Sequence, residues 1–597
     1  MRVSDFIFQV ISERENTARN VFMVSGGGNM HLVDALGRNE KLQYICNHNE
    51  QACTFAAEGY ARESNKTGLA LVTTGPGGTN AITGVYSAWV DSIPMLVISG
   101  QVKFVTTVLS QPELPLRQLG DQEINITELV KSVTKYAVTV TDKKDIRYHL
   151  EKALYLARSG RPGPVWLDIP LDIQAAQIEP DELDGYTPED EHQYDSQCKA
   201  VEELLKQAER PVIIAGNGVF LADACEELKE LIEKYSIPVI GTFARYDIIR
   251  DDHPLNYGRY GTIGQRRGNF IVQNSDLIIA IGSRLNVRAI SYNWEFFARE
   301  AKIVLVDIDR AELEKHTVKP FLKIQCDAGK FINDMLKTAP ADKNRYSEWI
   351  KYCDMISETC PIMTECKLTD QNYVNSYNFF NVISDLADEN AVYVFGNGTA
   401  CVSSYQTLRL RGSQQVIVNS GCASMGYDLP AAIGAYFAAP DRQLICIAGD
   451  GSLQMNIQEL QTAIHHKIPI KLFVFNNNGY ISIRNTQNNF FKGFKVGSDA
   501  ESGVSFPDII KLADAYGFKT AKIETQKELD KSIKAVLNMK EPVVCEVMLN
   551  PAEKMEPKLS SMSRPDGSIV SKPLEDMYPF MDREMFDACM IIRKMEE

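Results

Sequence analysis

The stretch AGDGSLQMNIQELQTAIHHKIPIKLFVFNNNGY, residues 448–480, joins two apolar runs through a helix-like segment. The first run ends in a Gly-Asp-Gly turn at 449–451, and the second ends in three asparagines at 476–478. Buried strands joined by helices are typical of a parallel sheet, whose strands all end at the same edge. Ligands bind at this edge in open α/β sheets. We therefore expect Asp450 and Asn477 to lie close together at a ligand-binding edge.

The same alternation of short apolar runs and longer helical patterns fills most of the chain. Two breaks divide the runs into three sets: an acidic stretch with Pro and Gly at 178–197, and a weaker break at 338–366. The pattern predicts an α/β protein with three doubly wound parallel-sheet domains. We place these domains at 1–180, 195–340 and 365–550, with a tail at 551–597.

Composition limits the kind of partner this chain can have. Of its 597 residues 44% are hydrophobic and 24% charged, as in ordinary globular proteins. A net charge of −15 argues against nucleic acid or an anionic membrane as partner. No apolar run is long enough for a membrane helix, and acids interrupt the N-terminal apolar segment. The thirteen cysteines form no CxxC pair, which is typical of reduced thiols in a cytoplasmic protein.

The residue types at 449–477 suit a metal that holds phosphate. Gly449 and Gly451 permit a sharp turn, and carboxylate and amide oxygens from Asp450 and Asn477 are hard ligands that suit Mg²⁺. A helix N-terminus near Ser452 would add N–H donors for an anion. For the Gly-Asp-Gly turn alone, an ordinary strand-to-helix connection explains the pattern equally well.

The turn, the 24 residues after Gly451 and the asparagines that follow resemble the diphosphate-binding signature of thiamine diphosphate (ThDP) enzymes. The resemblance implies that Asp450, Asn477 and the backbone carbonyl of Gly479 ligate Mg²⁺. It also places Gly449, Gly451 and Ser452 around the diphosphate. The domain at 365–550 is then the diphosphate-binding domain.

Two N-terminal segments, ICNHNEQACTFAAEGYAR (45–62) and LVTTGPGGTNAITGVYSAWVDSIPMLVISGQV (71–102), resemble the pyrimidine-binding domain of the acetolactate synthase family. Glu50 matches the glutamate that hydrogen-bonds N1′ of the aminopyrimidine. A buried carboxylate can share its proton with N1′, so that the 4′-amino group acts as a base toward the thiazolium C2 proton. The alternative for Glu50 is an acid that complements a helix dipole. The segment VSGGGNMHL (24–32) matches as well, and it would place Gly27 beside the thiazolium.

The segment NSGCASMGYDLPAAIGA (419–435) resembles the part of the family that bends the cofactor. Met425 holds the position of the apolar residue that wedges between the two rings, although core packing is an alternative for a methionine. The carbonyl of Ala423 would accept a hydrogen bond from the 4′-amino group. The family's diphosphate loop reads GNGTAC (396–401) here, and Thr399 keeps one hydrogen-bond donor.

The middle domain resembles the FAD-binding domain of acetolactate synthases, where the flavin is structural. Its departures from the family pattern leave open whether it binds FAD, another nucleotide or none. Four residues stand at matching positions: Arg284, Arg288, Asp307 and Asp327.

Residues at the substrate positions differ from the family. Asp121 replaces a phenylalanine that touches substrate, and Thr486 replaces a tryptophan that selects the acceptor, while Gln122 keeps its place. Hydroxyl and carboxylate groups in the pocket favour an acceptor that carries hydroxyls, because unmatched buried polar groups are costly. An Asp121 that points to solvent is the alternative. The tail at 557–586 resembles those of acetolactate-synthase-like proteins associated with bacterial sugars, and such tails close over the active site.

Together, the resemblance implies a carboligase that uses ThDP and Mg²⁺, with FAD as a further cofactor if the middle domain binds it. The donor would be a 2-oxo acid such as pyruvate, and the acceptor a carbonyl compound such as a keto-sugar nucleotide. An acetolactate synthase and a simple 2-oxo acid decarboxylase are the alternatives. The resemblance also implies a homodimer or homotetramer with active sites between chains.

Overall fold

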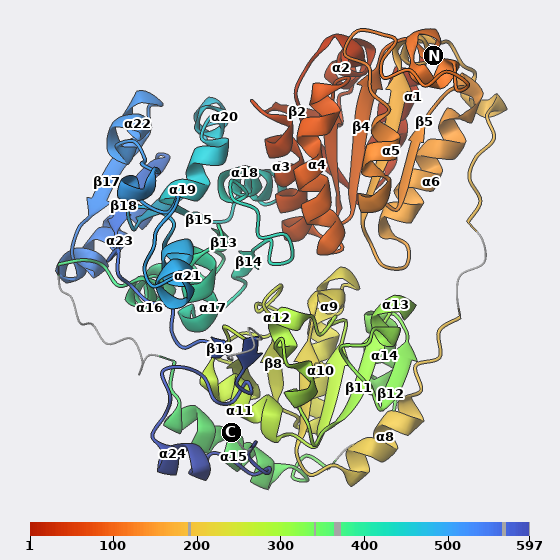
Figure 1. Cartoon of the computed structure of the whole chain (residues 1–597). Helices are drawn as coiled ribbons and strands as arrows, with labels where there is room; N and C mark the ends of the chain where they lie inside the picture. Colours follow the sequence, from red (N-terminus) through yellow and green to blue (C-terminus); the bar gives the residue numbers. More distant parts are fainter. Residues whose placement is uncertain (189–192, 340–341, 363–371, 564–568, 596–597) are drawn as a thin grey trace.

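The computed structural model describes residues 1–188, 193–339, 342–362, 372–563 and 569–595. It contains three six-stranded sheets in which every neighbouring pair of strands is parallel. Helices flank the sheets, and the three α/β units lie around a common centre (Figure 1). The predicted fold of three parallel-sheet α/β domains is confirmed.

The N-terminal unit has the strand order β2-β1-β3-β4-β6-β5. Strands β3, β4 and β6 are buried along their whole length, as continuous apolar runs predict for a covered parallel sheet. The strands are β1 (Thr17–Met23), β2 (Gln43–Cys46), β3 (Thr67–Val72), β4 (Met95–Gln101), β5 (Tyr136–Thr139) and β6 (Pro164–Pro170), and the helices are α1 (Val3–Glu13), α2 (Met30–Arg38), α3 (Glu50–Ser64), α4 (Pro76–Val90), α5 (Ile126–Val130), α6 (Ile146–Arg158) and α7 (Leu171–Ala175).

The middle unit has the order β12-β11-β10-β7-β8-β9. Its core is a separate hydrophobic cluster. The strands are β7 (Pro211–Ala215), β8 (Val239–Gly241), β9 (Asn256–Arg259), β10 (Leu277–Ile281), β11 (Lys302–Asp307) and β12 (Leu322–Gln325), and the helices are α8 (Cys198–Gln207), α9 (Asn217–Leu221), α10 (Cys225–Tyr235), α11 (Arg266–Asn274), α12 (Val287–Ile290), α13 (Arg310–Glu314), α14 (Ala328–Leu336) and α15 (Ser347–Thr359).

The C-terminal unit has the order β14-β13-β15-β16-β18-β17. The strands are β13 (Val392–Phe395), β14 (Gln415–Ile417), β15 (Leu444–Gly449), β16 (Lys471–Asn476), β17 (Lys519–Ile523) and β18 (Val543–Met548), and the helices are α16 (Ser376–Leu386), α17 (Thr399–Thr407), α18 (Asp428–Ala438), α19 (Asp450–Leu453), α20 (Glu459–His465), α21 (Ile481–Phe490), α22 (Ile509–Ala515) and α23 (Leu529–Leu537).

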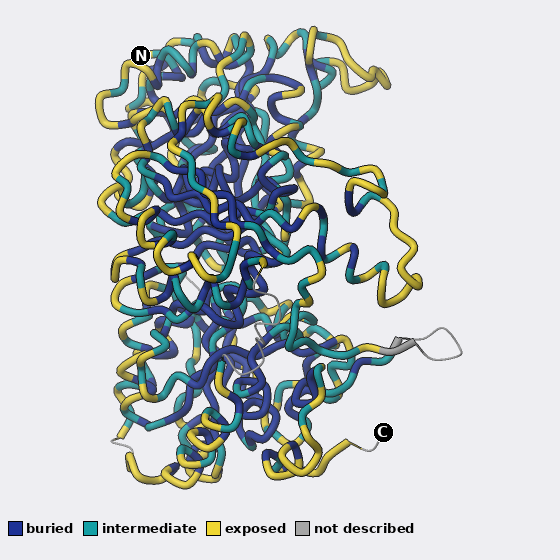
Figure 2. The backbone as a smooth tube through the Cα atoms, turned by 90° about the vertical axis from the view of Figure 1, so that its left-hand side faces the viewer, coloured by how far each residue is buried: buried dark blue, intermediate teal, exposed yellow. Residues whose placement is uncertain are grey.

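The N-terminal and C-terminal units share one hydrophobic core, because helix α3 packs closely against α18. Small residues make this approach possible. A Cβ on Gly434 would lie 1.9 Å from the Ala56 carbonyl oxygen, and a Cβ on Gly59 would lie 2.2 Å from that of Ala431. Buried stretches gather inside the molecule, and exposed stretches lie mostly at its periphery (Figure 2).

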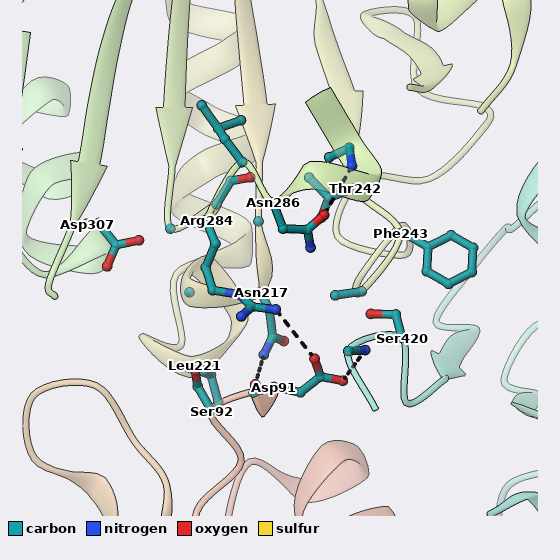
Figure 3. Close-up of a pocket in the computed structure, with 18 of the residues that line it drawn as sticks. Asp91, Ser92, Asn217, Leu221, Thr242, Phe243, Arg284, Asn286, Asp307 and Ser420 are labelled. Atoms are coloured by element: carbon teal, nitrogen blue, oxygen red, sulfur yellow. Dashed lines mark hydrogen bonds and ion pairs between the residues drawn. The ribbon is translucent and has the colours of Figure 1, made fainter. Parts of the chain in front are cut away.

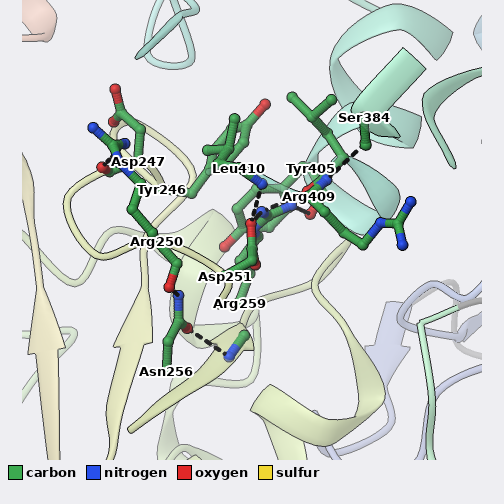
Figure 4. A network of polar contacts seen from close by, with 12 residues as sticks. Tyr246, Asp247, Arg250, Asp251, Asn256, Arg259, Ser384, Tyr405, Arg409 and Leu410 are labelled. Carbon is green, nitrogen blue, oxygen red and sulfur yellow. Dashed lines mark hydrogen bonds and ion pairs between the residues drawn. The ribbon is translucent and has the colours of Figure 1, made fainter. Parts of the chain in front are cut away.

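A buried arginine joins the middle unit to the C-terminal unit. Arg259 is 1% exposed and donates to the carbonyl oxygens of Tyr405 and Leu408, at 2.8 Å and 2.7 Å. It pairs with Asp251 at 2.6 Å and lies over the Tyr246 ring (Figure 4). A buried charge with this many partners fixes the two units relative to each other.

The tail after β18 follows two surfaces. Residues 551–561 run beside α21, whereas the segment up to α24 (Arg583–Ala588) packs on the middle unit (Figure 1). There Asn269 donates to the Leu574 carbonyl, and Glu575 pairs with Arg299 at 2.8 Å. The tail also contains the antiparallel pair β19 (Ser561–Ser563) and β20 (Ile569–Ser571).

Candidate active site

The carboxyl edge of the C-terminal sheet brings three predicted segments together. Strands β13, β15 and β16 are neighbours in the sheet, and Thr399, Asp450 and Asn477 follow their carboxyl ends. Thr399 begins α17 and Asp450 begins α19, so that two helix N-termini point their N–H groups to the same edge. This is the arrangement that the sequence spacing predicted.

Asp450 is 2% exposed and lies among backbone donors. Its carboxylate accepts from the N–H of Gly451 at 2.8 Å and from that of Gly479 at 3.2 Å. Burial raises the pKa of the Asp450 carboxyl to about 6, against the opposing effect of these N–H groups. A buried carboxylate without a cationic side-chain partner suits a metal ligand.

Asn477 and Gly479 form the opposite side of this cluster. The side-chain oxygen of Asn477 is buried without a hydrogen-bond partner among the described residues. Gly479 has φ +134°, where a Cβ would lie 2.3 Å from the Ser498 carbonyl oxygen, so only glycine fits. Arg484 donates to the backbone carbonyl of Asn477 at 2.7 Å and to that of Asn478 at 2.8 Å, which holds the loop in place.

The second buried polar atom of this cluster is the hydroxyl oxygen of Thr399. This hydroxyl is buried and has no hydrogen-bond partner in the described part of the chain, while Gly398 just before it has φ +64° and starts the helix. Gly449 leaves open space where a Cβ would lie. Two buried polar atoms without partners, a buried carboxylate and an open glycine fit a diphosphate and its Mg²⁺. Asp450, Asn477 and the carbonyl of Gly479 would hold the metal.

The segment predicted to bend the cofactor adjoins this cluster through Ser452. Ser452 accepts from the Gly426 N–H at 3.0 Å and donates to the buried Asp428 at 2.6 Å. Met425 is half-buried beside Gly426. Ala423 is exposed with φ +52°, and its carbonyl accepts from the Asn397 side chain at 2.6 Å.

The carboxyl edge of the N-terminal sheet holds the other predicted residues. Glu50 is the first residue of α3, where Asn49 caps the helix, and its carboxylate accepts from Asn80 at 3.0 Å. Gly27 is exposed in a short turn after β1, with open space where a Cβ would lie. The hydrogen bonds found for Glu50 within the described ranges join it to no residue of the Asp450 cluster.

Gln122 and Asp121 lie on the loop between β4 and α5, and both side chains are exposed in the single chain. Gln122 has φ +61°, and its carbonyl oxygen lies so close to Gly75 that a Cβ there would approach to 2.0 Å. The exposure of Asp121 agrees with the alternative stated for it. Buried Glu123 anchors the loop by accepting from the N–H groups of Val108 and Leu119.

A cavity of about 520 Å³ lies at the carboxyl edge of the middle sheet (Figure 3). Its wall combines loops after β7, β8, β10, β11 and β12 with parts of both other units. Burial raises the pKa of the Asp307 carboxyl to about 6. The predicted FAD positions all line this cavity: Arg284, Arg288, Asp307 and Asp327.

Asp91 connects this cavity to the cofactor segment, a link that the sequence did not reveal. Its carboxylate pairs with the buried Arg62 at 2.7 Å and lies 3.8 Å from Arg284 (Figure 3). The same carboxylate accepts from the N–H of Gly421, two residues before Ala423. The spacing of Asp91 and Pro94 could have indicated Asp91 as a candidate site residue. Its partners Arg284 and Gly421, however, belong to two other units.

A larger cavity, of about 1210 Å³, lies between α21 and residues 551–561 of the tail. Thr486 lines it, and its hydroxyl donates to the Ser482 carbonyl at 3.1 Å. The cavity is continuous with the metal loop, because Asn478 also lines it. The structure thus places Thr486 beside the Asp450 cluster and keeps Asp121 on the N-terminal unit.

Comparison with known families defines the class. The chain matches the N-terminal TPP binding domain of thiamine pyrophosphate enzymes over residues 1–128, their central domain over 198–335, and their C-terminal TPP binding domain over 396–547. This chain therefore belongs to the ThDP-dependent enzymes, and ThDP with Mg²⁺ is its cofactor.

Within this class the chain is an acetolactate synthase-like carboligase. It is 32% identical to a probable acetolactate synthase large subunit of Methanococcus aeolicus, covering 89% of this chain and 90% of the relative. It is 31% identical to the isozyme 1 large subunit of Escherichia coli K12, covering 89% and 92%. It is 32% identical to the large subunit of Lactococcus lactis IL1403, covering 92% and 93%.

Among the described residues, no helix is both long enough and apolar enough to cross a membrane.

Proposed function

We propose that this enzyme decarboxylates a 2-oxo acid, with pyruvate as the simplest donor, and transfers the two-carbon unit to a carbonyl acceptor that carries hydroxyl groups. A keto-sugar nucleotide is the acceptor class we favour. The observation that carries this choice is the 1210 Å³ cavity beside the metal loop, lined by Thr486, Ser482, Asn485 and Asn489. Such a wall offers donors and acceptors to hydroxyls.

Each proposed site residue has a distinct task. Bound ThDP supplies an electron sink for the carbanion that decarboxylation creates. Glu50 holds the proton at N1′ of the aminopyrimidine, and Gln122 orients the reacting carbonyl groups. Asp450 and Asn477 hold Mg²⁺ and the diphosphate, while Met425 keeps the cofactor bent.

The proposal also covers a bound nucleotide, the assembly of chains and the location of the enzyme. FAD, or another nucleotide, binds in the 520 Å³ cavity, supported by the four residues at matching positions in its wall. Active sites form between two chains, supported by the exposure of the predicted site residues Asp121 and Gln122 in the single chain. The enzyme works in the cytoplasm, supported by free cysteines such as Cys53, Cys446 and Cys545.

An acetolactate synthase that joins two 2-oxo acids is the second candidate, and the names of the relatives favour it. A simple decarboxylase would need no acceptor cavity. Product analysis separates the three. Pyruvate alone should give little acetolactate, whereas pyruvate with a keto-sugar nucleotide should give a branched sugar. Rapid acetolactate formation from pyruvate alone would rule out the preferred acceptor.

Glu50→Gln tests the shared chemistry. We expect pyruvate turnover to fall at least ~100-fold, because a glutamine holds no proton for N1′. Binding of ThDP, followed by fluorescence, should change little, since the diphosphate end is intact. The exposed Glu40→Gln is the matched control. Unchanged turnover in Glu50→Gln would refute the mechanism.

A further inference from the structure

The 1210 Å³ cavity has two walls of different chemistry. Helix α21 supplies short polar side chains, and the tail supplies lysines. A three-carbon acid would fill only a small part of this volume, so the cavity has room for a larger molecule. The lining residues used below are Asn485, Thr486 and Asn489 on the helix, and Lys554 and Lys558 on the tail.

Asn485 is an unpartnered group on the helix wall. Its side-chain nitrogen is buried and donates to no acceptor among the described residues. A buried amide donor without a partner destabilises the folded chain. A ligand that accepts a hydrogen bond there would remove this cost, as a sugar hydroxyl or a phosphate oxygen can.

The tail wall carries uncompensated positive charge. Lys554 and Lys558 form no ion pair within the described ranges, whereas Lys495 in the same lining is neutralised by Asp499 at 2.8 Å. Glu556 is the one further acid of this lining. Two free ammonium groups in a chain of net charge −15 form a local anion site that the global charge does not predict.

We propose that the acceptor is phosphorylated, and that Lys554 and Lys558 bind its phosphate groups while Asn485, Thr486 and Asn489 bind its hydroxyls. This inference rests on the proposed function, because it describes the acceptor subsite of the same reaction. The carbonyl carbon would then lie toward Asn478 and the metal loop. The tail lysines, 68 or more positions after Thr486, select the acceptor together with α21.

Calorimetry on the full-length enzyme with ThDP and Mg²⁺ tests this subsite directly. UDP-glucose is the probe, because it has a diphosphate and hydroxyls but no reactive carbonyl, and glucose is its matched partner. We expect UDP-glucose to bind at least ~30-fold more tightly than glucose. The double variant Lys554→Gln/Lys558→Gln should weaken UDP-glucose at least ~10-fold, and higher salt should weaken it in the wild type.

Lys492→Gln is the control, since Lys492 is exposed nearby but does not line the cavity. Equal affinities for UDP-glucose and glucose, undetectable UDP-glucose binding, or unchanged binding in the double variant would each overturn the proposal. Decarboxylation of pyruvate by the same wild-type sample is measured in parallel. Its absence would count against the proposed function and leave the binding result to decide the subsite.

Discussion

At the residue scale, the proposed role of Asp450 as a metal ligand can be tested through its charge. Asp450→Asn keeps the size of the side chain but removes the charge that attracts Mg²⁺. We expect the apparent Kd for ThDP, measured by fluorescence at fixed Mg²⁺, to rise at least ~30-fold, which corresponds to about 2 kcal/mol. Asp441→Asn serves as control, because Asp441 lies in the exposed turn before β15, the strand that leads to Asp450. A Kd within twofold of the wild type would show that Asp450 does not ligate the metal.

A second buried carboxylate, Asp168, predicts a pH effect on stability. It accepts from Ser99 at 2.6 Å and from Gln101 and Thr139 at 3.2 Å, and Glu123 is the charged group that faces it. Burial raises its pKa from 3.8 to about 7. The folded state therefore binds the proton more tightly, and its stability falls as pH rises between these two values.

Asp168→Asn removes this dependence. Between pH 5 and pH 7 the variant should gain about 2 kcal/mol relative to the wild type, because only the wild type must bury a charge. Thermal unfolding at both pH values, with cofactor absent, measures the change. A wild-type-minus-variant difference in Tm that is the same at pH 5 and pH 7 would contradict the assignment.

At this scale the sequence indicated where the predicted cofactor residues lie in the fold, but not which residues hold them in place. Asp450 and Asn477 could be placed together because each follows an apolar run that ends at one sheet edge. Arg484 and Asp91 could not be placed, since Arg484 binds backbone carbonyls, which leave no side-chain pattern, and Asp91 binds Gly421 of another unit. For Asp121 the sequence allows a pocket residue or a side chain that points to solvent, and within one chain it is exposed.

At the scale of elements, glycine allows α3 and α18 to approach each other closely. Gly434→Ala should lower Tm by about 3 °C or more, because the added methyl meets the backbone of Ala56, which cannot move aside. Gly37→Ala in exposed α2 is the control, since its Cβ meets nothing and alanine favours a helix. Equal Tm values for the two variants would show that the helices can separate at little cost.

The sequence indicates that the strands are present, but it does not give their order in the sheets. Apolar runs such as 68–75 and 443–451 indicate buried strands, but which strands become neighbours depends on the crossover connections and on how helices pack on each sheet. The tail illustrates the same limit. Its apolar residues predicted that it packs, and the structure places Leu574 and Phe586 on the middle unit, while Lys554 and Lys558 line the acceptor cavity.

At the scale of the whole molecule, the proposal that Glu50 and Asp450 of one site come from different chains can be tested with a pair of variants. If each site combines Glu50 of one protomer with Asp450 of its partner, then Glu50→Gln and Asp450→Asn are each nearly inactive alone, provided that ThDP is kept well below the raised Kd of Asp450→Asn. A mixed dimer contains one site with both native residues and one site with neither. Random mixing makes half of the dimers mixed, so about a quarter of wild-type activity should return.

The experiment is to unfold and refold the two variants together, or to co-express them with different tags, and to measure pyruvate turnover. Each variant treated alone is the control for partial activity. Sites contained within single chains would give no recovery at any mixing ratio, because every site would then carry one substitution. Recovery that rises to a maximum at equal amounts of the two variants therefore requires a shared site, and with it an assembly of at least two chains.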